Sequence, residues 1–170
     1  MNPEQALFLR DHLVACLRLE HPLTRRVIEA IPPAKQDYRP DDIGRSAIDL
    51  AWHIVAAEHR FMDAVVNGVF DLTGSGRPSA LSTPTAISSW YSETFLADIQ
   101  RVKAMSSDQL LKIVDFRGLF QLPAVAYLQS VMGHSIHHRG QLSMVLRPMG
   151  ALVPAIYGES YDSAQAKSGA

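Results

Sequence analysis

The stretch that decides the fold is PAVAYLQSVMGHSIHHRGQLSMVLR, residues 123–147, in which a proline is followed by a long run at helical spacing. One face of the predicted helix carries Tyr127, Val131, His134, His138, Leu142 and Val145. At about 100° per residue these side chains fall within one arc, which indicates an amphipathic helix from Pro123 to about Arg147. Pro148 and Gly150 then end it.

Two histidines lie inside this apolar face, four residues apart. Side chains at i and i+4 of a helix stack one above the other, with about 5–6 Å between their Cβ atoms. A neutral imidazole in a core needs a hydrogen-bond partner, whereas one metal ion can satisfy the acceptor nitrogens of both rings. We therefore favour a metal site at His134 and His138 over two hydrogen-bonded core histidines. His137 lies to one side, as a flanking or supporting residue.

Three further helices are predicted upstream. The first runs from Pro3 to about Ile31, and Pro22 is expected to kink or divide it. The second begins after Ser46, a typical N-cap residue, and ends at Gly68. The third begins at Thr83-Pro84, an N-cap followed by a proline at the first helical position, and ends near Met105.

The segments between and after these helices complete the prediction. Residues 106–121 are expected to be irregular, apart from a short extended piece at 112–116, and residues 153–170 to form a tail with a frayed end. The connection between the second and third helices is long enough for a crossover. We predict an all-α protein, a single domain over residues 1–170 that forms a four-helix bundle with one long crossover connection.

Composition restricts the classes of function. The net charge of the 170-residue chain is -1, so no broad cationic surface for nucleic acid is expected. Cys16 is the only cysteine, which excludes an intrachain disulfide and suits a reducing compartment. No apolar stretch approaches the ~20 residues that cross a bilayer, and no signal-peptide pattern opens the chain. We expect a soluble cytoplasmic protein that binds neither nucleic acid nor membrane.

Polar residues of the second helix extend the candidate site. His53 lies at the edge of the apolar face and is the best candidate for a third ligand from a neighbouring helix. Glu58 lies near the middle of that face, where an unpaired carboxylate is costly. We favour an ion pair between Glu58 and Arg139 or Arg60, and keep an acid/base or supporting role as the alternative. The remaining histidines are interpreted as surface or boundary residues: His12, His21 and His59.

The chain resembles the DinB-like (damage-inducible, YfiT-related) family of four-helix-bundle metalloproteins. The resemblance covers nearly the whole chain and rests on four segments: MNPEQALFLRDHL (1–13), YRPDDIGRSAIDLAWHIVAAEHRFM (38–62), HSIHHRGQLSMVLRPMG (134–150) and VPAIYGES (153–160). It implies that the family's metal ligands fall on His53, His134 and His138, the residues that spacing also selects. It further implies a homodimer and a divalent transition metal, zinc or nickel.

Two functional hypotheses follow. Three histidines leave a coordination position open, as catalytic metal sites do. Because some relatives are thiol S-transferases that use low-molecular-weight thiols, the first hypothesis is a metal-dependent enzyme for thiol transfer to, or hydrolysis of, a small electrophilic molecule. The alternative is a stress or ligand-binding protein that uses the metal without turnover. A bundle without metal is a third reading.

No catalytic residue is assigned by these patterns. Four polar residues are candidates to face the open position: Glu58, Tyr127, His137 and Arg139.

Overall fold

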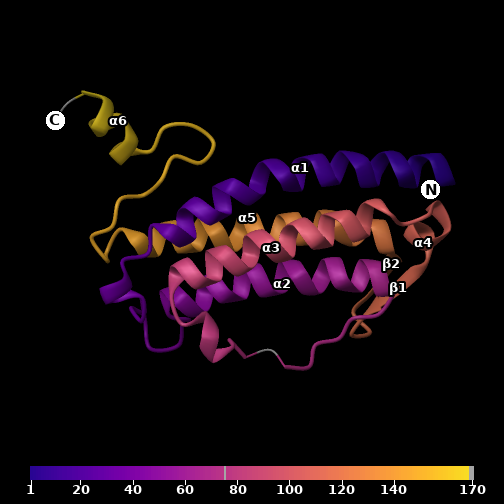
Figure 1. Ribbon diagram of the computed structural model, residues 1–170, viewed down its shortest axis with the longest axis horizontal. Coiled ribbons are helices and arrows are strands. Elements are labelled where there is room, and N and C mark those ends of the chain that lie inside the picture. Colours follow the sequence, from indigo (N-terminus) through magenta and orange to yellow (C-terminus); the bar gives the residue numbers. More distant parts are fainter. Residues whose placement is uncertain (75, 169–170) are drawn as a thin grey trace.

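The computed structural model describes residues 1–74 and 76–168 and contains four long helices (Figure 1). These are α1 (Pro3–Glu29), α2 (Ala47–Asn67), α3 (Pro84–Lys103) and α5 (Tyr127–Leu146). Their inward faces bury a continuous apolar core that includes Leu17, Ile28, Ile54, Met62, Ile87, Ile99, Leu128 and Leu142. The predicted all-α bundle is therefore confirmed.

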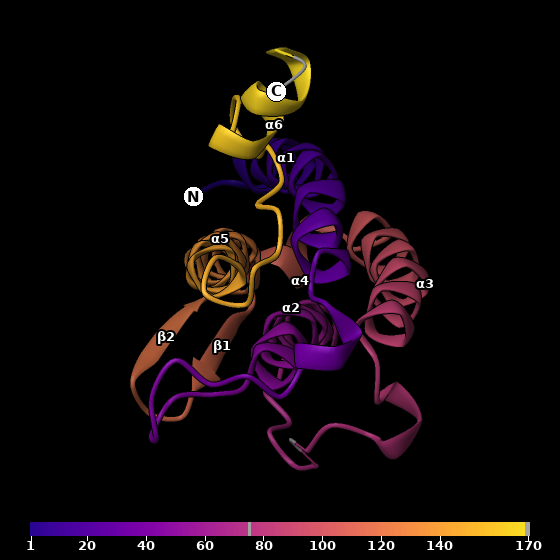
Figure 2. The same ribbon diagram turned by 90° about the vertical axis from the view of Figure 1, so that its left-hand side faces the viewer.

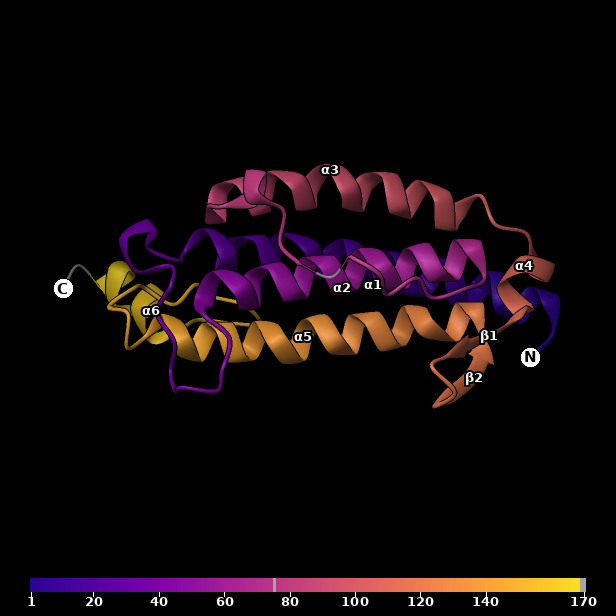
Figure 3. The same cartoon turned by 90° about the horizontal axis from the view of Figure 1, so that it is seen from below.

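The four helices form a square in which α1 and α2 occupy opposite corners (Figure 2). Helix α2 packs against α3 and, most extensively, against α5, while α1 packs against the other sides of α3 and α5. Residues 68–74 and 76–83 return along the length of the bundle, so that α2 and α3 run in the same direction (Figures 1 and 3). This return confirms the predicted long crossover, and it places the antiparallel pair α2 and α5 side by side.

The helix ends follow local sequence signals. The Ser46 hydroxyl accepts a hydrogen bond from the Asp49 amide at 3.2 Å, and Thr83 caps α3 in the same way. Gly68 ends α2 with a φ of 75°, a conformation that glycine adopts without steric cost. Pro22 does not divide α1, which continues through it to Glu29. Proline leaves one hydrogen bond of the helix unmade, and the packing of α1 against α3 and α5 offsets this loss.

The segment after α3 is more regular than predicted. A one-turn helix, α4 (Ser107–Leu111), precedes an antiparallel hairpin of β1 (Ile113–Phe116) and β2 (Phe120–Pro123). The extended piece at 112–116 is thus confirmed, but its partner strand was missed. Pro123 ends β2 and does not open the last helix, which begins at Tyr127 after the 3-10 turn Ala124–Ala126.

The C-terminal tail is also more ordered than predicted. It contains α6 (Tyr161–Ser168), which Figure 1 shows beyond the bundle end. Asp162 fastens this helix by accepting from the Arg147 guanidinium at 2.8 Å and from the Val153 amide at 2.7 Å. The predicted frayed end, residues 169–170, lies outside the described residues.

Two short 3-10 turns complete the secondary structure, at Pro33–Lys35 and Ser79–Leu81. None of the helices in the described part of the chain is both long enough and apolar enough to span a bilayer.

Candidate metal centre

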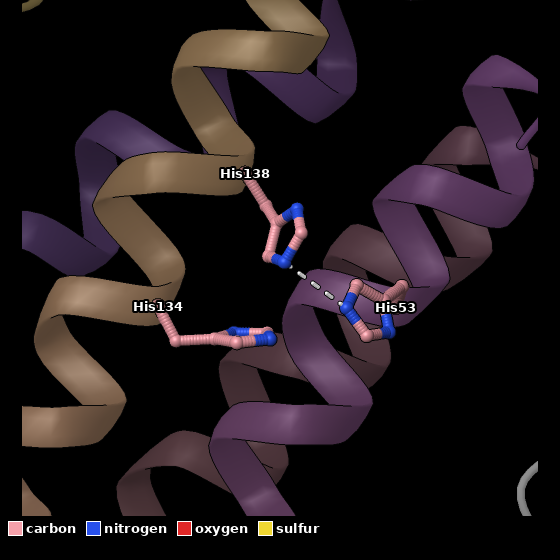
Figure 4. A group of neighbouring side chains, drawn as sticks. All are labelled: His53, His134 and His138. Atoms are coloured by element: carbon pink, nitrogen blue, oxygen red, sulfur yellow. Dashed lines mark hydrogen bonds between the residues drawn. The ribbon is translucent and has the colours of Figure 1, made fainter. Parts of the chain in front are cut away.

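Three histidine side chains from two helices converge on one point (Figure 4). His53 projects from α2, and His134 and His138 project from successive turns of α5. One ring nitrogen of each lies within 4.8 Å of those of the other two. The Nε2 atoms of His53 and His138 are 3.2 Å apart. The structure thus brings together the three residues predicted as ligands.

The cluster forms because two local patterns meet at the most extensive helix contact of the bundle. The four-residue spacing stacks the His134 and His138 rings, whose centroids are 4.3 Å apart. His53 faces them from the antiparallel helix, with centroid distances of 4.9 and 4.6 Å. All three side chains are half-buried, so the centre lies at the rim of the bundle and not deep inside it as the apolar pattern predicted.

A neighbouring glutamine orients one of the rings. The Nδ1–H of His138 donates to Oε1 of Gln141 at 2.6 Å, one helical turn further along α5. Because Nδ1 then carries the proton, Nε2 of His138 presents its lone pair to the cluster. Such an outer partner raises ligand basicity and fixes ring orientation in metal sites. Sequence reasoning missed Gln141, although its i+3 spacing from His138 was a usable signal.

The environment keeps the histidines neutral. Burial, followed by the charges of Arg45 and His138, lowers the pKa of His53 to about 4. Burial and the two neighbouring histidines lower the pKa of His134 to about 4 as well. Burial also lowers the pKa of His138, against the hydrogen bond that His138 donates to Gln141. At neutral pH the rings are therefore uncharged and carry free lone pairs, which is the form that binds metal.

The donor set fits a divalent transition metal by its spacing and its chemistry. Nitrogen ligands 2.0–2.1 Å from a tetrahedral ion lie roughly 3.3 Å from one another, close to the 3.2 Å between the Nε2 atoms of His53 and His138. Imidazole is also a ligand that suits zinc and nickel.

Glu58, considered as an ion-pair or acid/base residue, is held by two hydroxyls instead. It is buried and accepts hydrogen bonds from Tyr91 at 2.8 Å and from Ser135 at 2.6 Å. The favoured ion pair with Arg139 or Arg60 is therefore wrong. Burial, against these two hydrogen bonds, raises the pKa of Glu58 to about 7.

The other polar candidates are engaged away from the cluster or exposed beside it. Tyr127 donates its hydroxyl to the carbonyls of Val114 and Phe120 and so fastens the hairpin to α5. The Arg139 guanidinium pairs with Glu20 of α1 at 2.6 Å. His137 is exposed, and its ring packs edge-on against that of His138.

The remaining histidines stay outside the centre, but one is more than a boundary residue. The Nδ1 atom of His59 lies 2.7 Å from a carboxylate oxygen of Asp98, which is buried on α3. This hydrogen bond raises the pKa of His59 and ties α2 to α3. No spacing in the sequence links the two residues. His21 stacks on Phe95, and exposed His12 contacts Cys16 on its own helix.

Two hollows open beside the cluster, and they meet at Arg45. One, of about 290 Å³, is lined by His53 together with Arg60 and Arg77. The other, of about 390 Å³, is lined by Gln141 and by apolar side chains that include Met144. On the hairpin side, Phe61 packs within 6.2 Å of the His134 ring. The arginines gave no recognisable signal in the sequence because they come from different segments.

The chain is similar in sequence to two known proteins. It is 28% identical to YrdA of Bacillus subtilis over 156 residues, which is 87% of each protein. It is 25% identical to YjoA of the same organism over 130 residues, 75% of this chain and 82% of YjoA.

Two solved structures have a fold similar to that of this chain. The crystal structure of the DinB-like protein YjoA matches with a TM-score of 0.72 and 23% identity, over 87% of this chain and 99% of that one. A DinB-like protein from Bacillus cereus matches with a TM-score of 0.73 and 20% identity, over 86% and 97% of the two chains. The sequence model of the DinB family matches residues 3–169, and the chain therefore belongs to the DinB family.

Proposed function

We propose that this DinB protein binds a divalent transition metal, zinc or nickel, through His53, His134 and His138 and uses it as a metal-dependent enzyme. The observation that carries the proposal is the convergence of three neutral imidazoles, one of them oriented by Gln141. When bound, such an ion supplies a Lewis acid with an open position, at which water or a thiol is deprotonated at neutral pH.

The chain's own residues prepare this chemistry. Gln141 keeps the His138 proton on Nδ1, away from the cluster. The Phe61 ring packs beside that of His134, with centroids 6.2 Å apart, and a hollow of about 290 Å³ opens beside His53. These features support thiol S-transfer to, or hydrolysis of, a small electrophilic substrate, with a low-molecular-weight thiol as cosubstrate in the first case. We further propose that the protein is cytoplasmic and forms a homodimer. Light scattering of the purified protein, which measures its molar mass, tests the homodimer.

One observation favours a second candidate function. Three of the four polar residues considered as candidates to face the open coordination position are engaged elsewhere: Glu58, Tyr127 and Arg139. A metal centre without such a group also suits a protein that binds a ligand through its metal without turnover. Turnover of a thiol and an electrophile by metal-loaded protein separates the two functions.

Metal content tests the proposal directly. Protein purified without a polyhistidine tag and repleted with metal is expected to hold close to one ion per chain by elemental analysis. His134→Ala is expected to lose it, whereas His137→Ala, which removes an exposed histidine three residues further on, is expected to keep it. Wild-type protein that holds no metal after repletion would contradict both functions.

A further inference from the structure

The hollow beside His53 is strongly cationic. Its charged lining consists of three arginines and one aspartate: Arg45, Arg60, Arg77 and Asp49. The formal charge of this lining is thus three positive and one negative, or +2, in a chain whose net charge is only -1. The hollow next to the candidate metal ligand His53 therefore carries a local excess of positive charge.

The single acidic group of the hollow is already engaged. Asp49 accepts from the Ser46 hydroxyl at 2.7 Å and from the Arg77 guanidinium at 3.3 Å. Arg77 also donates to the Leu81 carbonyl at 3.0 Å, so this arginine serves to hold the 68–83 connection against α2. Once Asp49 and Arg77 are paired, two positive charges of this lining remain, although one of them, on Arg60, also borders a further hollow that Asp63 and Asp71 line.

Those two charges belong to Arg45 and Arg60. Arg60 donates one hydrogen bond, to the Gly74 carbonyl at 3.1 Å, and forms no ion pair with the described residues. Arg45 is exposed and, among residues 1–74 and 76–168, its guanidinium has neither a hydrogen-bond acceptor nor a carboxylate within ion-pair distance. A guanidinium offers five N–H donors in a fork that matches an oxyanion. Both side chains thus keep unused donors beside the centre.

We infer that the small molecule which binds at the candidate metal centre is an anion, with a carboxylate or similar oxyanion group held by Arg45 and Arg60. The inference rests on the proposed metal site and names the substrate class of that site. The hollow of about 290 Å³ limits the ligand to a small molecule.

The second hollow adds a complementary surface for the same ligand. Its charged residues are Arg45 and Asp41, and it continues over Leu50, Met144 and Val145, with Gln141 at the edge of the metal centre. An uncharged portion of the ligand finds apolar contacts there while its oxyanion stays at the arginines.

Two matched thiols test the inference: 3-mercaptopropionate, which is an anion, and 3-mercaptopropionamide, which is neutral and nearly the same size. Binding of each to zinc-loaded protein is measured by calorimetry, which requires no turnover. The anion is expected to bind about tenfold more tightly, in line with a charge-assisted hydrogen bond. Raising the ionic strength is expected to reduce this preference because Arg45 is exposed.

Variants assign the preference to the arginines. Arg45→Gln and Arg60→Gln are expected to weaken binding of the anion severalfold each, to leave binding of the amide unchanged, and to keep a full metal content. Arg26→Gln removes an exposed arginine of α1 and is the matched control, expected to behave like wild type.

The outcomes separate this inference from the proposed function. Metal-loaded wild type that binds both thiols equally, or neither, overturns the anion inference and leaves the metal site standing. A preference that survives in the double variant Arg45→Gln/Arg60→Gln also overturns it. Protein that holds no metal overturns the proposed function, and the inference falls with it.

Discussion

Two neighbouring pairs of polar residues on α5 differ in their burial and in their hydrogen-bond partners. His134 and His138 face α2 and are half-buried, and a buried ring nitrogen of His134 has no partner in the described part of the chain. Ser135 and Arg139, each one residue further on, are buried and fully engaged, with Glu58 and Glu20 as their partners at 2.6 Å. The same four-residue spacing thus has two different roles. The buried pair, which contacts α1 and α2, holds the bundle together, whereas the half-buried pair lies where a ligand can reach it.

The largest effect is expected from breaking the buried pair. Arg139→Met leaves the Glu20 carboxylate without its buried partner, and we expect the free energy of unfolding to fall by about 4 kcal/mol, as for other broken buried ion pairs. Urea denaturation of metal-free protein measures it, with Arg26→Met as the exposed control. If both variants unfold at the same urea concentration, the ion pair of Arg139 with Glu20 does not stabilise the bundle.

The second effect concerns Glu58, whose pKa is raised from 4.5 to about 7 in the folded protein by burial. A raised pKa means that the Glu58 carboxyl holds its proton more tightly in the folded state than in the unfolded state. The stability that this difference contributes is fully present below pH 4.5 and is lost as the pH rises to 7. The loss amounts to about 3 kcal/mol. Histidines with lowered pKa values act in the opposite direction over the same range, so the test compares variants.

We expect Glu58→Gln to gain stability relative to wild type between pH 5 and pH 8, because an amide does not become charged. Denaturation at both pH values measures the difference. Exposed Glu93→Gln, on α3, is the control and is expected to follow wild type. A difference that does not change with pH would show that Glu58 titrates normally.

The pair His134 and His138 is expected to respond to metal. Zinc at a hundredfold excess over its dissociation constant stabilises a site that exists only in the folded state by about 2.7 kcal/mol. The unfolding temperature of wild type should therefore rise when zinc is added and fall back when a chelator removes it. The unfolding temperature of His134→Ala should not change with zinc. A similar zinc shift in His134→Ala would place the metal elsewhere.

The smallest effect is expected at Gln141. Gln141→Ala removes the acceptor that orients His138, and loss of such an outer partner costs about tenfold or more in metal affinity. A competition titration against a chromophoric chelator measures it. Gln129→Ala, an exposed glutamine of the same helix, is expected to leave the affinity unchanged.

The features that the sequence predicted correctly depend on short-range rules. Ser46, Thr83 and Gly68 mark helix ends because their roles involve residues at most a turn away. His134 and His138 could be paired by spacing alone, and His53 joined them through its place at the edge of a helix face. What the structure adds is that their nitrogens converge.

The missed features depend on contacts between distant residues or on unusual turns. The hairpin turn uses Arg117 and Gly118, both with positive φ, and an arginine there does not give the Asn-Gly signature of such turns. The pairing of Glu58 with Tyr91 and Ser135 was missed because a helical pattern predicts a face but not the neighbour that it meets.

The crossover of residues 68–83 has a consequence for how this protein can diverge. The three histidines are fixed by two helices, whereas Gly76 and Arg77 of the hollow next to His53 come from the crossover. Helices that share a core accept few changes, but a surface connection accepts insertions and substitutions readily. The candidate metal site and this part of the hollow can therefore change separately, so that relatives with the same three histidines and a different crossover are expected to differ in the shape of the hollow.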